Sequence, residues 1–169
     1  IKGIPEGEQI TYVFPGPMDN NKRLEYINYE QGNPVGTWTQ WSRDNENRLR
    51  KTGEIIFEAG AGRWREWDPN TLVVIRAGDY ENWERSGLWK SWDPQEVLVS
   101  EGEYVQGKKA GKWTWYKDGE DKGWQENYNN GVLNGKFNNL SPYADIRGVG
   151  AYSDGLSLIH ISEPTRHHV

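Results

Sequence analysis

A glycine followed two residues later by an aromatic side chain recurs along this chain at nearly constant spacing. The intervals between successive glycines are 26, 25, 24 and 24 residues. A fixed period of this length is typical of repeat proteins, in which each unit buries its apolar face only against its neighbours. Such an array favours an extended binding surface over a catalytic cleft. The pairs are Gly36/Trp38, Gly62/Trp64, Gly87/Trp89, Gly111/Trp113 and Gly135/Phe137.

Further positions recur in register with this glycine. Seven residues before it stands a tyrosine in most units, and five residues after it stands a second apolar residue. We expect the rings at glycine+2 to form the core between units. The rings at glycine+5, and the tryptophans outside the repeat, are either core or exposed contact residues. These candidate binding residues are Trp41, Trp67, Trp92 and Tyr116 at glycine+5, with Trp83, Trp115 and Trp124 outside the repeat.

Each unit reads as one β-hairpin. Residues 112–116, KWTWY, are rich in aromatic and threonine side chains and predict a strand. A tight turn follows at 117–120, where Gly119 can take a positive φ. In two other units the turn is Asp-Pro, at Asp68-Pro69 and Asp93-Pro94, and proline ends the strand. A second strand is predicted at 71–76 and at 96–104 in those units.

Consecutive hairpins of this kind predict an all-β fold. We expect an elongated single-layer antiparallel meander of hairpins, about 24 residues per repeat, with residues 45–51 forming a lengthened hairpin loop. In a regular strand, the glycine+2 and glycine+5 positions face opposite sides. Either the tryptophans line both faces of the sheet, or a bulge brings them to one face. If both faces carry them, a partly exposed row is a candidate contact surface.

The two ends of the chain depart from the pattern. Residues 1–25 are interpreted as a degenerate first repeat and a long turn, and residues 26–155 as the repeat array. Gly150 and Tyr152 begin another unit. Residues 156–166, LSLIHISEPTR, instead resemble the in-frame translation of a sequencing-library adapter, so 156–169 are expected to be a non-native tail. The array is therefore expected to be a truncated piece of a longer protein.

Composition argues against several kinds of site. There is no cysteine, and all three histidines lie in the tail at His160, His167 and His168. We therefore expect no metal, no cofactor and no enzyme. The net charge of −5 argues against nucleic acid, and the longest apolar run, 72–75, is too short to span a membrane. The densest carboxylates, Glu101/Glu103 and Asp118/Glu120/Asp121, are interpreted as solvated turn charges.

Two segments carry a resemblance to a known family. Residues 103–119, EYVQGKKAGKWTWYKDG, and 127–137, NYNNGVLNGKF, resemble the MORN-type repeat, and are closest to its bacterial variant in YwqK-like antitoxins. The resemblance implies an elongated sheet that works by binding. It further implies the antitoxin or immunity component of a bacterial toxin module, with a toxin as protein partner and a cytoplasmic location. Glu58 and Trp83 depart from the pattern, since a glycine is usual at that position.

The alternative function is glycan binding by an envelope-associated protein, periplasmic or secreted. Sugar rings stack on tryptophan, so this hypothesis requires exposed rings arranged in one row. If the glycine+5 and non-repeated tryptophans form such a row, spaced like sugar residues, glycan is favoured. If they form a flat patch of mixed chemistry, a protein partner is favoured, because tryptophan and tyrosine dominate protein interfaces.

Overall fold

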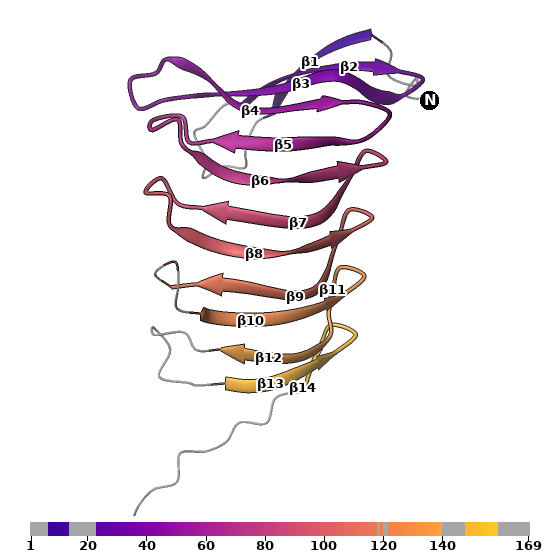
Figure 1. Cartoon of the computed structure of the whole chain (residues 1–169), viewed down its shortest axis with the longest axis vertical. Coiled ribbons are helices and arrows are strands. Elements are labelled where there is room, and N and C mark those ends of the chain that lie inside the picture. The colour runs from indigo at the N-terminus through magenta and orange to yellow at the C-terminus, as the bar shows by residue number, and fades with distance from the viewer. Residues whose placement is uncertain (1–6, 14–22, 118, 120–121, 140–147, 159–169) are drawn as a thin grey trace, which may run out of the picture.

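The computed structural model describes residues 7–13, 23–117, 119, 122–139 and 148–158 of the chain. Over these residues it is all-β without a helix, and its strands form one open antiparallel sheet in which each strand pairs with the next along the chain. Figure 1 shows the strands stacked along the long axis as a single layer. The predicted all-β meander is thereby confirmed.

The strands are β1 (Gly7–Val13), β2 (Arg23–Glu30), β3 (Asn33–Arg43), β4 (Leu49–Phe57), β5 (Gly62–Trp67), β6 (Val74–Glu81), β7 (Glu84–Trp92), β8 (Leu98–Val105), β9 (Lys108–Tyr116), β10 (Lys122–Asn129), β11 (Val132–Leu133), β12 (Gly135–Asn139), β13 (Gly148–Ser153) and β14 (Leu156–Leu158). Strand β11 pairs only with β10, and β12 continues the sheet beyond it.

The repeat glycine marks a bulge in the first strand of a hairpin. Around Gly87, Ala77 pairs with Lys90 while Asp79 pairs with Ser86, so β7 has two residues more than β6. The φ of Gly87 is +64°, and Gly36 and Gly111 have similar values of +65° and +60°. A side chain would strain the backbone in this left-handed region, which explains why glycine stands there.

A second set of glycines lies directly beneath the glycine+2 tryptophans. A Cβ on Gly78 would lie 2.2 Å from the ring of Trp89, and a Cβ on Gly102 would lie 2.2 Å from the ring of Trp113. Gly53 has the same relation to Trp64, at 2.4 Å. Each of these rings thus lies flat against the neighbouring strand, which is possible only where that strand has no side chain.

The buried rings form a continuous ladder across the hairpins. Tyr80, Trp89, Tyr104 and Trp113 follow one another with ring centroids 5.2–5.6 Å apart in edge-to-face contacts. Such pairs contribute about 0.5–1.5 kcal/mol each beyond their buried area. Trp64, Trp89 and Trp113 are the buried tryptophans, at 5%, 3% and 6% exposure. We name the side of the sheet that carries them the core face.

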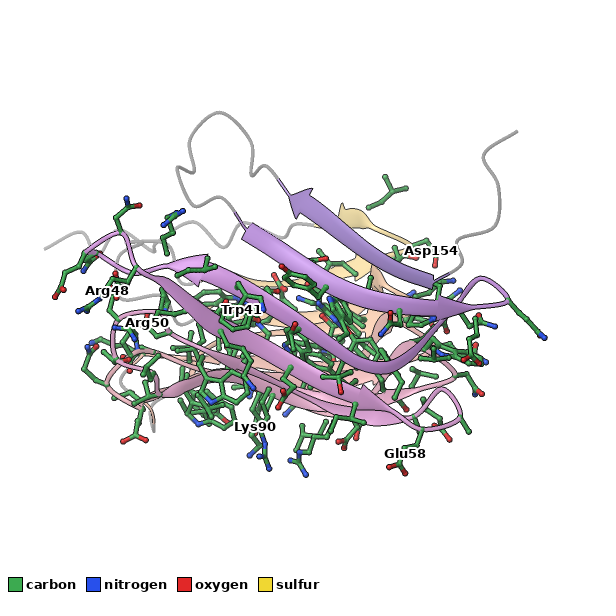
Figure 2. All side chains as sticks on the ribbon, turned by 90° about the horizontal axis from the view of Figure 1, so that it is seen from above. Trp41, Arg48, Arg50, Glu58, Lys90 and Asp154 are labelled. Atoms are coloured by element: carbon green, nitrogen blue, oxygen red, sulfur yellow. The ribbon has the colours of Figure 1, made fainter. Side chains whose placement is uncertain are left out.

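The hairpin connections also stack on one another. At one end of the strands, a backbone N–H of each turn donates to a carbonyl of the previous hairpin: Trp83 to Gly60 at 2.8 Å, Gly107 to Arg85 at 3.0 Å and Gly131 to Lys109 at 2.9 Å. In Figure 2, Glu58 and Asp154 lie at this end, and Arg48 and Arg50 lie at the opposite end. Neighbouring units are therefore joined through backbone as well as through rings.

Aspartate side chains accept backbone hydrogen bonds in the turns at the opposite end, and as a result three predicted boundaries differ from the observed ones. The Asp68 carboxylate accepts from the backbone N–H groups of Asn70 and Thr71, both at 2.9 Å, and Leu72 takes a φ of +61°. The strand predicted at 71–76 therefore begins only at Val74, and the strand predicted at 96–104 begins only at Leu98. The loop predicted at 45–51 was too long, because Arg48 N–H donates to Asp44 at 2.8 Å and β4 begins at Leu49. Gly119 has the predicted positive φ, at +83°.

At both ends, residues outside the expected repeat array of 26–155 form strands of the sheet. β1 starts at Gly7, whose φ of +72° matches that of the repeat glycines, and pairs with β2. Residues 156–158, expected to belong to a non-native tail, form β14 and pair with β13. Residues 14–22 and 159–169 lie outside the described part. Among the described residues, no helix has the length and apolar character needed to cross a membrane.

Candidate binding surfaces

The glycine+5 residues lie on the face of the sheet opposite the core face, which we name the outer face. Trp41 pairs with Lys51, and Lys51 Nζ lies 5.9 Å from the centroid of the Trp67 ring, so these three share one side. Bulges do occur beside Trp41, Trp67 and Trp92, but each adds its extra residue to the partner strand. The rings at glycine+2 and glycine+5 therefore remain on opposite faces.

Trp92 and Tyr116 continue the row. Lys90, two residues before Trp92 on the same strand, forms an ion pair with Glu101 at 3.1 Å. The hydroxyl of Tyr116 donates to Glu101 at 2.6 Å. This hydrogen bond, together with burial, raises the pKa of Tyr116 to about 12. The outer face thus carries one aromatic residue per hairpin, about 10 Å from the next because two strands separate them.

The outer face is chemically mixed. Its rings are half-buried, and ion pairs stand between them, such as Lys51 with Glu54 at 2.8 Å. Beside Trp41 the face is hollowed by a shallow cavity of about 420 Å³, which is lined by Tyr26, Thr39 and the exposed Leu49 among others. The glycine+5 residue of the last full unit, Leu140, lies outside the described residues.

The non-repeated tryptophans do not join this row. Trp115 contacts Trp113 on the core face, with centroids 6.0 Å apart, and stacks on Trp124 at 5.1 Å and 10°. Trp124 is 39% exposed. Trp83 lies in the β6–β7 turn, where its Nε1 donates to the carbonyl of Pro34 at 2.8 Å. Of the seven candidate residues, the four at glycine+5 share the outer face, Trp115 and Trp124 stack on the core face, and Trp83 lies in a turn.

The repeat residues themselves are structural where the structure describes them. Trp38 is half-buried and packs against Trp64 at 5.2 Å, although its buried Nε1 has no hydrogen-bond partner. Gly62 is the repeat glycine without a positive φ, while Gly135 has a φ of +94°. Phe137 lies in β12, but its side chain is not among those described.

Of the two predicted carboxylate clusters, the structure describes only the one at Glu101 and Glu103. Glu101 is held by Lys90 and Tyr116 on the outer face, whereas Asp118, Glu120 and Asp121 lie outside the described residues. In the part of the chain that the structure describes, no three Asp, Glu, His or Cys side chains are placed to hold a metal ion.

The core face carries a polar site that the sequence did not reveal. Arg85 and Lys109 stand two residues before successive repeat glycines and extend over the aromatic ladder. The guanidinium of Arg85 lies 4.7 Å from the centroid of the Trp89 ring, and Lys109 Nζ lies 4.2 Å from that of Trp113. Both line a cavity of about 270 Å³. The sequence signal that could have indicated this site is the equal spacing of Arg85 and Lys109 from their repeat glycines. It was not recognised, because cations on the surface of a sheet are usually solvated.

The electrostatics of this cavity differ at the two cations. Burial lowers the pKa of Lys109, an effect that the nearby Glu126 partly opposes. Burial would also lower the pKa of Arg85, but hydrogen bonds to Tyr80 and Tyr104 outweigh it and the pKa is raised. The Arg85 Nη1 to Tyr104 hydroxyl distance is 3.2 Å. The raised pKa keeps Arg85 positively charged near neutral pH.

Comparisons with known proteins give little further information. No family model matches the chain, and no curated protein is similar to it. Among solved structures, the chain is similar to an S. aureus TarM mutant in complex with fondaparinux, alpha-GlcNAc-glycerol and UDP, at 10% identity and a TM-score of 0.27, covering 60% of this chain and 18% of that one. A second TarM structure has 9% identity and a TM-score of 0.25, with 78% and 19% covered. The chain thus spans about a fifth of these proteins, and scores this low carry no argument about fold or function.

Proposed function

We propose that this chain is a non-catalytic binding module that holds a protein partner on its outer face. The observation that carries the proposal is the row of half-buried aromatic residues on the outer face of the sheet: Trp41, Trp67, Trp92 and Tyr116. Large rings on a rigid strand lose little conformational freedom on binding, and tryptophan and tyrosine are enriched among the residues that dominate interface energies.

The chemistry between the rings supports a protein rather than a glycan. The outer face alternates rings with ion pairs such as Lys90 with Glu101, which resembles the mixed composition of protein interfaces. The tryptophans that a glycan hypothesis would combine are divided between two faces and a turn. The cavity beside Trp41 offers a place for one apolar anchor side chain of the partner. The family resemblance makes a bacterial toxin the first partner to test.

A photo-crosslinking experiment tests the proposal. Leu88 lies on the outer face, two residues before Lys90 where β7 pairs regularly with β8, and is 49% exposed. A photoreactive phenylalanine analogue at Leu88 should capture one discrete protein in the source cells, and the same analogue at Trp124 on the core face should not capture it. Equal capture from both faces would contradict the proposal.

Binding of the captured protein, or of a toxin encoded beside this gene, should then be measured by calorimetry. We expect Trp67→Ala and Trp92→Ala each to weaken binding by about 2 kcal/mol or more, as at interface hot spots. Trp124→Ala is the matched control, because it removes the same ring from the other face. A loss below about 0.5 kcal/mol for both outer-face variants, with circular dichroism unchanged, would refute the outer face as the binding surface.

A further inference from the structure

The cavity on the core face has an unusual charge composition for this chain. None of its ten lining residues is aspartate or glutamate, although the whole chain has 25 acidic and 20 basic residues. Of its basic lining residues, Arg76 forms an ion pair with Glu66 at 3.1 Å, and the Lys90 side chain pairs with Glu101 on the outer face. The cations on the core face that remain are Arg85 and Lys109, and they give the cavity its positive charge.

Arg85 and Lys109 form no ion pair with a carboxylate among the described residues. Within the described part of the chain, neither has a carboxylate oxygen within 4.0 Å, the limit for an ion pair. The nearest acidic residue to affect Lys109 is Glu126, and its carboxylate already accepts from the Tyr128 hydroxyl at 2.7 Å. Partly desolvated cations without a counter-charge are costly, so an anion entering the cavity would be attracted to both.

The other polar groups of the cavity are hydroxyls. Ser91 and Ser100 lie 2.7 Å apart, Oγ to Oγ, so one of the two can donate to the other and the second keeps its proton for a ligand. Tyr104 accepts from Arg85 and keeps its own O–H as a donor. Rings of the aromatic ladder form the rest of the wall. Charge, hydroxyl donors and rings together suit an oxyanion attached to a cyclic body.

We propose that this cavity binds a small ligand that carries an oxyanion, a carboxylate or a phosphate, on a single ring. Its volume of about 270 Å³ is near the lower limit of small-molecule sites and suits one ring better than a chain. The site is on the face opposite the proposed protein-binding row, so it is a second function rather than a part of the first. Arg85 and Lys109 hold the anion, and Tyr104 and the two serines orient it.

Nuclear magnetic resonance of the indole N–H groups tests this assignment, because all ten tryptophans give a signal. The probes are glucuronate, the uncharged glucose of the same ring size, and inorganic phosphate. Glucuronate should shift the signals of Trp89, Trp113 and Trp115 saturably, and glucose should not. Saturable binding of phosphate without glucuronate would keep the anion site and assign its ligand as a phosphate. The absence of saturable shifts with both anions would overturn the proposal.

Variants separate binding from a purely structural role of the two cations. Lys109→Met keeps the apolar stem over the Trp113 ring and removes the charge, and should weaken anion binding by about tenfold or more. Lys109→Arg should retain binding, which keeps the test valid if the methionine variant folds poorly. Trp67→Ala on the outer face should leave anion binding unchanged. Unaltered binding in a folded double variant, Arg85→Met with Lys109→Met, would overturn the assignment.

Discussion

A methyl group placed beneath a buried tryptophan tests the packing of the hairpins. Gly102 lies under Trp113, and a Cβ there would meet three ring atoms at 2.2–2.4 Å. The ring cannot move outward freely, because Lys109 lies over it and Tyr104 packs against its edge at 5.2 Å. We therefore expect Gly102→Ala to distort the β8–β9 pair or to displace the ring.

The size of the loss lies between two limits. Overpacking of a core costs about 1–3 kcal/mol, and complete loss of a buried tryptophan contact costs about 3–5 kcal/mol. We expect Gly102→Ala to lower the free energy of unfolding by about 2–4 kcal/mol. With a urea m-value of about 2 kcal/mol/M, the unfolding midpoint should fall by about 1–2 M. Urea melts followed by both tryptophan fluorescence and circular dichroism measure this shift.

Gly123→Ala is the matched control. Gly123 is also a buried strand glycine, but a Cβ there would meet its nearest atom at 3.4 Å, an ordinary contact. We expect its free energy of unfolding to remain within about 1 kcal/mol of the original, with a small gain from the restricted unfolded chain. The smaller side chain in Trp113→Leu should also reduce the cost of Gly102→Ala when the two are combined. The packing argument is refuted if Gly102→Ala is as stable as Gly123→Ala.

Three other perturbations have defined outcomes. Trp83→Phe removes the hydrogen bond to the Pro34 carbonyl and should cost about 0.5–1.5 kcal/mol in urea melts; no loss would show that this bond does not join the units. Burial would raise the pKa of Asp44, but hydrogen bonds from neighbouring arginines outweigh burial and hold that pKa well below its usual range. The ionised Asp44 therefore stabilises the folded protein fully above about pH 4, and this stabilisation is lost in stronger acid. Asp44→Asn should therefore lose less stability than the original protein between about pH 5 and pH 2, and an equal loss would contradict this role. The pKa of Tyr116 is raised to about 12, so the stability gained from its hydrogen bond to Glu101 is complete below about pH 10 and is lost as the pH rises toward 12. Glu101→Gln should shift the phenolate absorbance titration of Tyr116 to lower pH. An unchanged titration would show that Glu101 does not cause the raised pKa.

Much of the fold follows from the spacing of aromatic residues and turn residues. Alternating short strands between glycine and Asp-Pro turns predict hairpins, and their even succession predicts a meander. The glycines beneath the rings were not recognised, although Gly53, Gly78 and Gly102 each stand eleven residues before a glycine+2 tryptophan. That offset appears in the sequence, but its meaning depends on the register between two strands, which the spacing within one unit does not define.

The candidate site was predicted only in part, for two physical reasons. Strand alternation predicts that glycine+2 and glycine+5 differ in face, but a bulge in the same strand would reverse this, and the sequence does not show which strand has the extra residue. Trp83 depends on a carbonyl 49 residues away, at Pro34, which no local pattern indicates. The surroundings of Arg85 and Lys109 are set by neighbouring strands, which place aromatic rings beneath both cations. Sequence spacing within one unit does not indicate these contacts.

The central claim is that the described strands form one open layer of stacked hairpins. Small-angle X-ray scattering tests it directly. Thirteen strands follow one another along the hydrogen-bonded path, which at about 4.8 Å per strand gives a radius of gyration of about 18 Å or more. A single layer also gives a thickness of about 10 Å. A radius of gyration near the 15–16 Å expected of a compact chain of 169 residues, with a thickness of about 20 Å, would contradict the account.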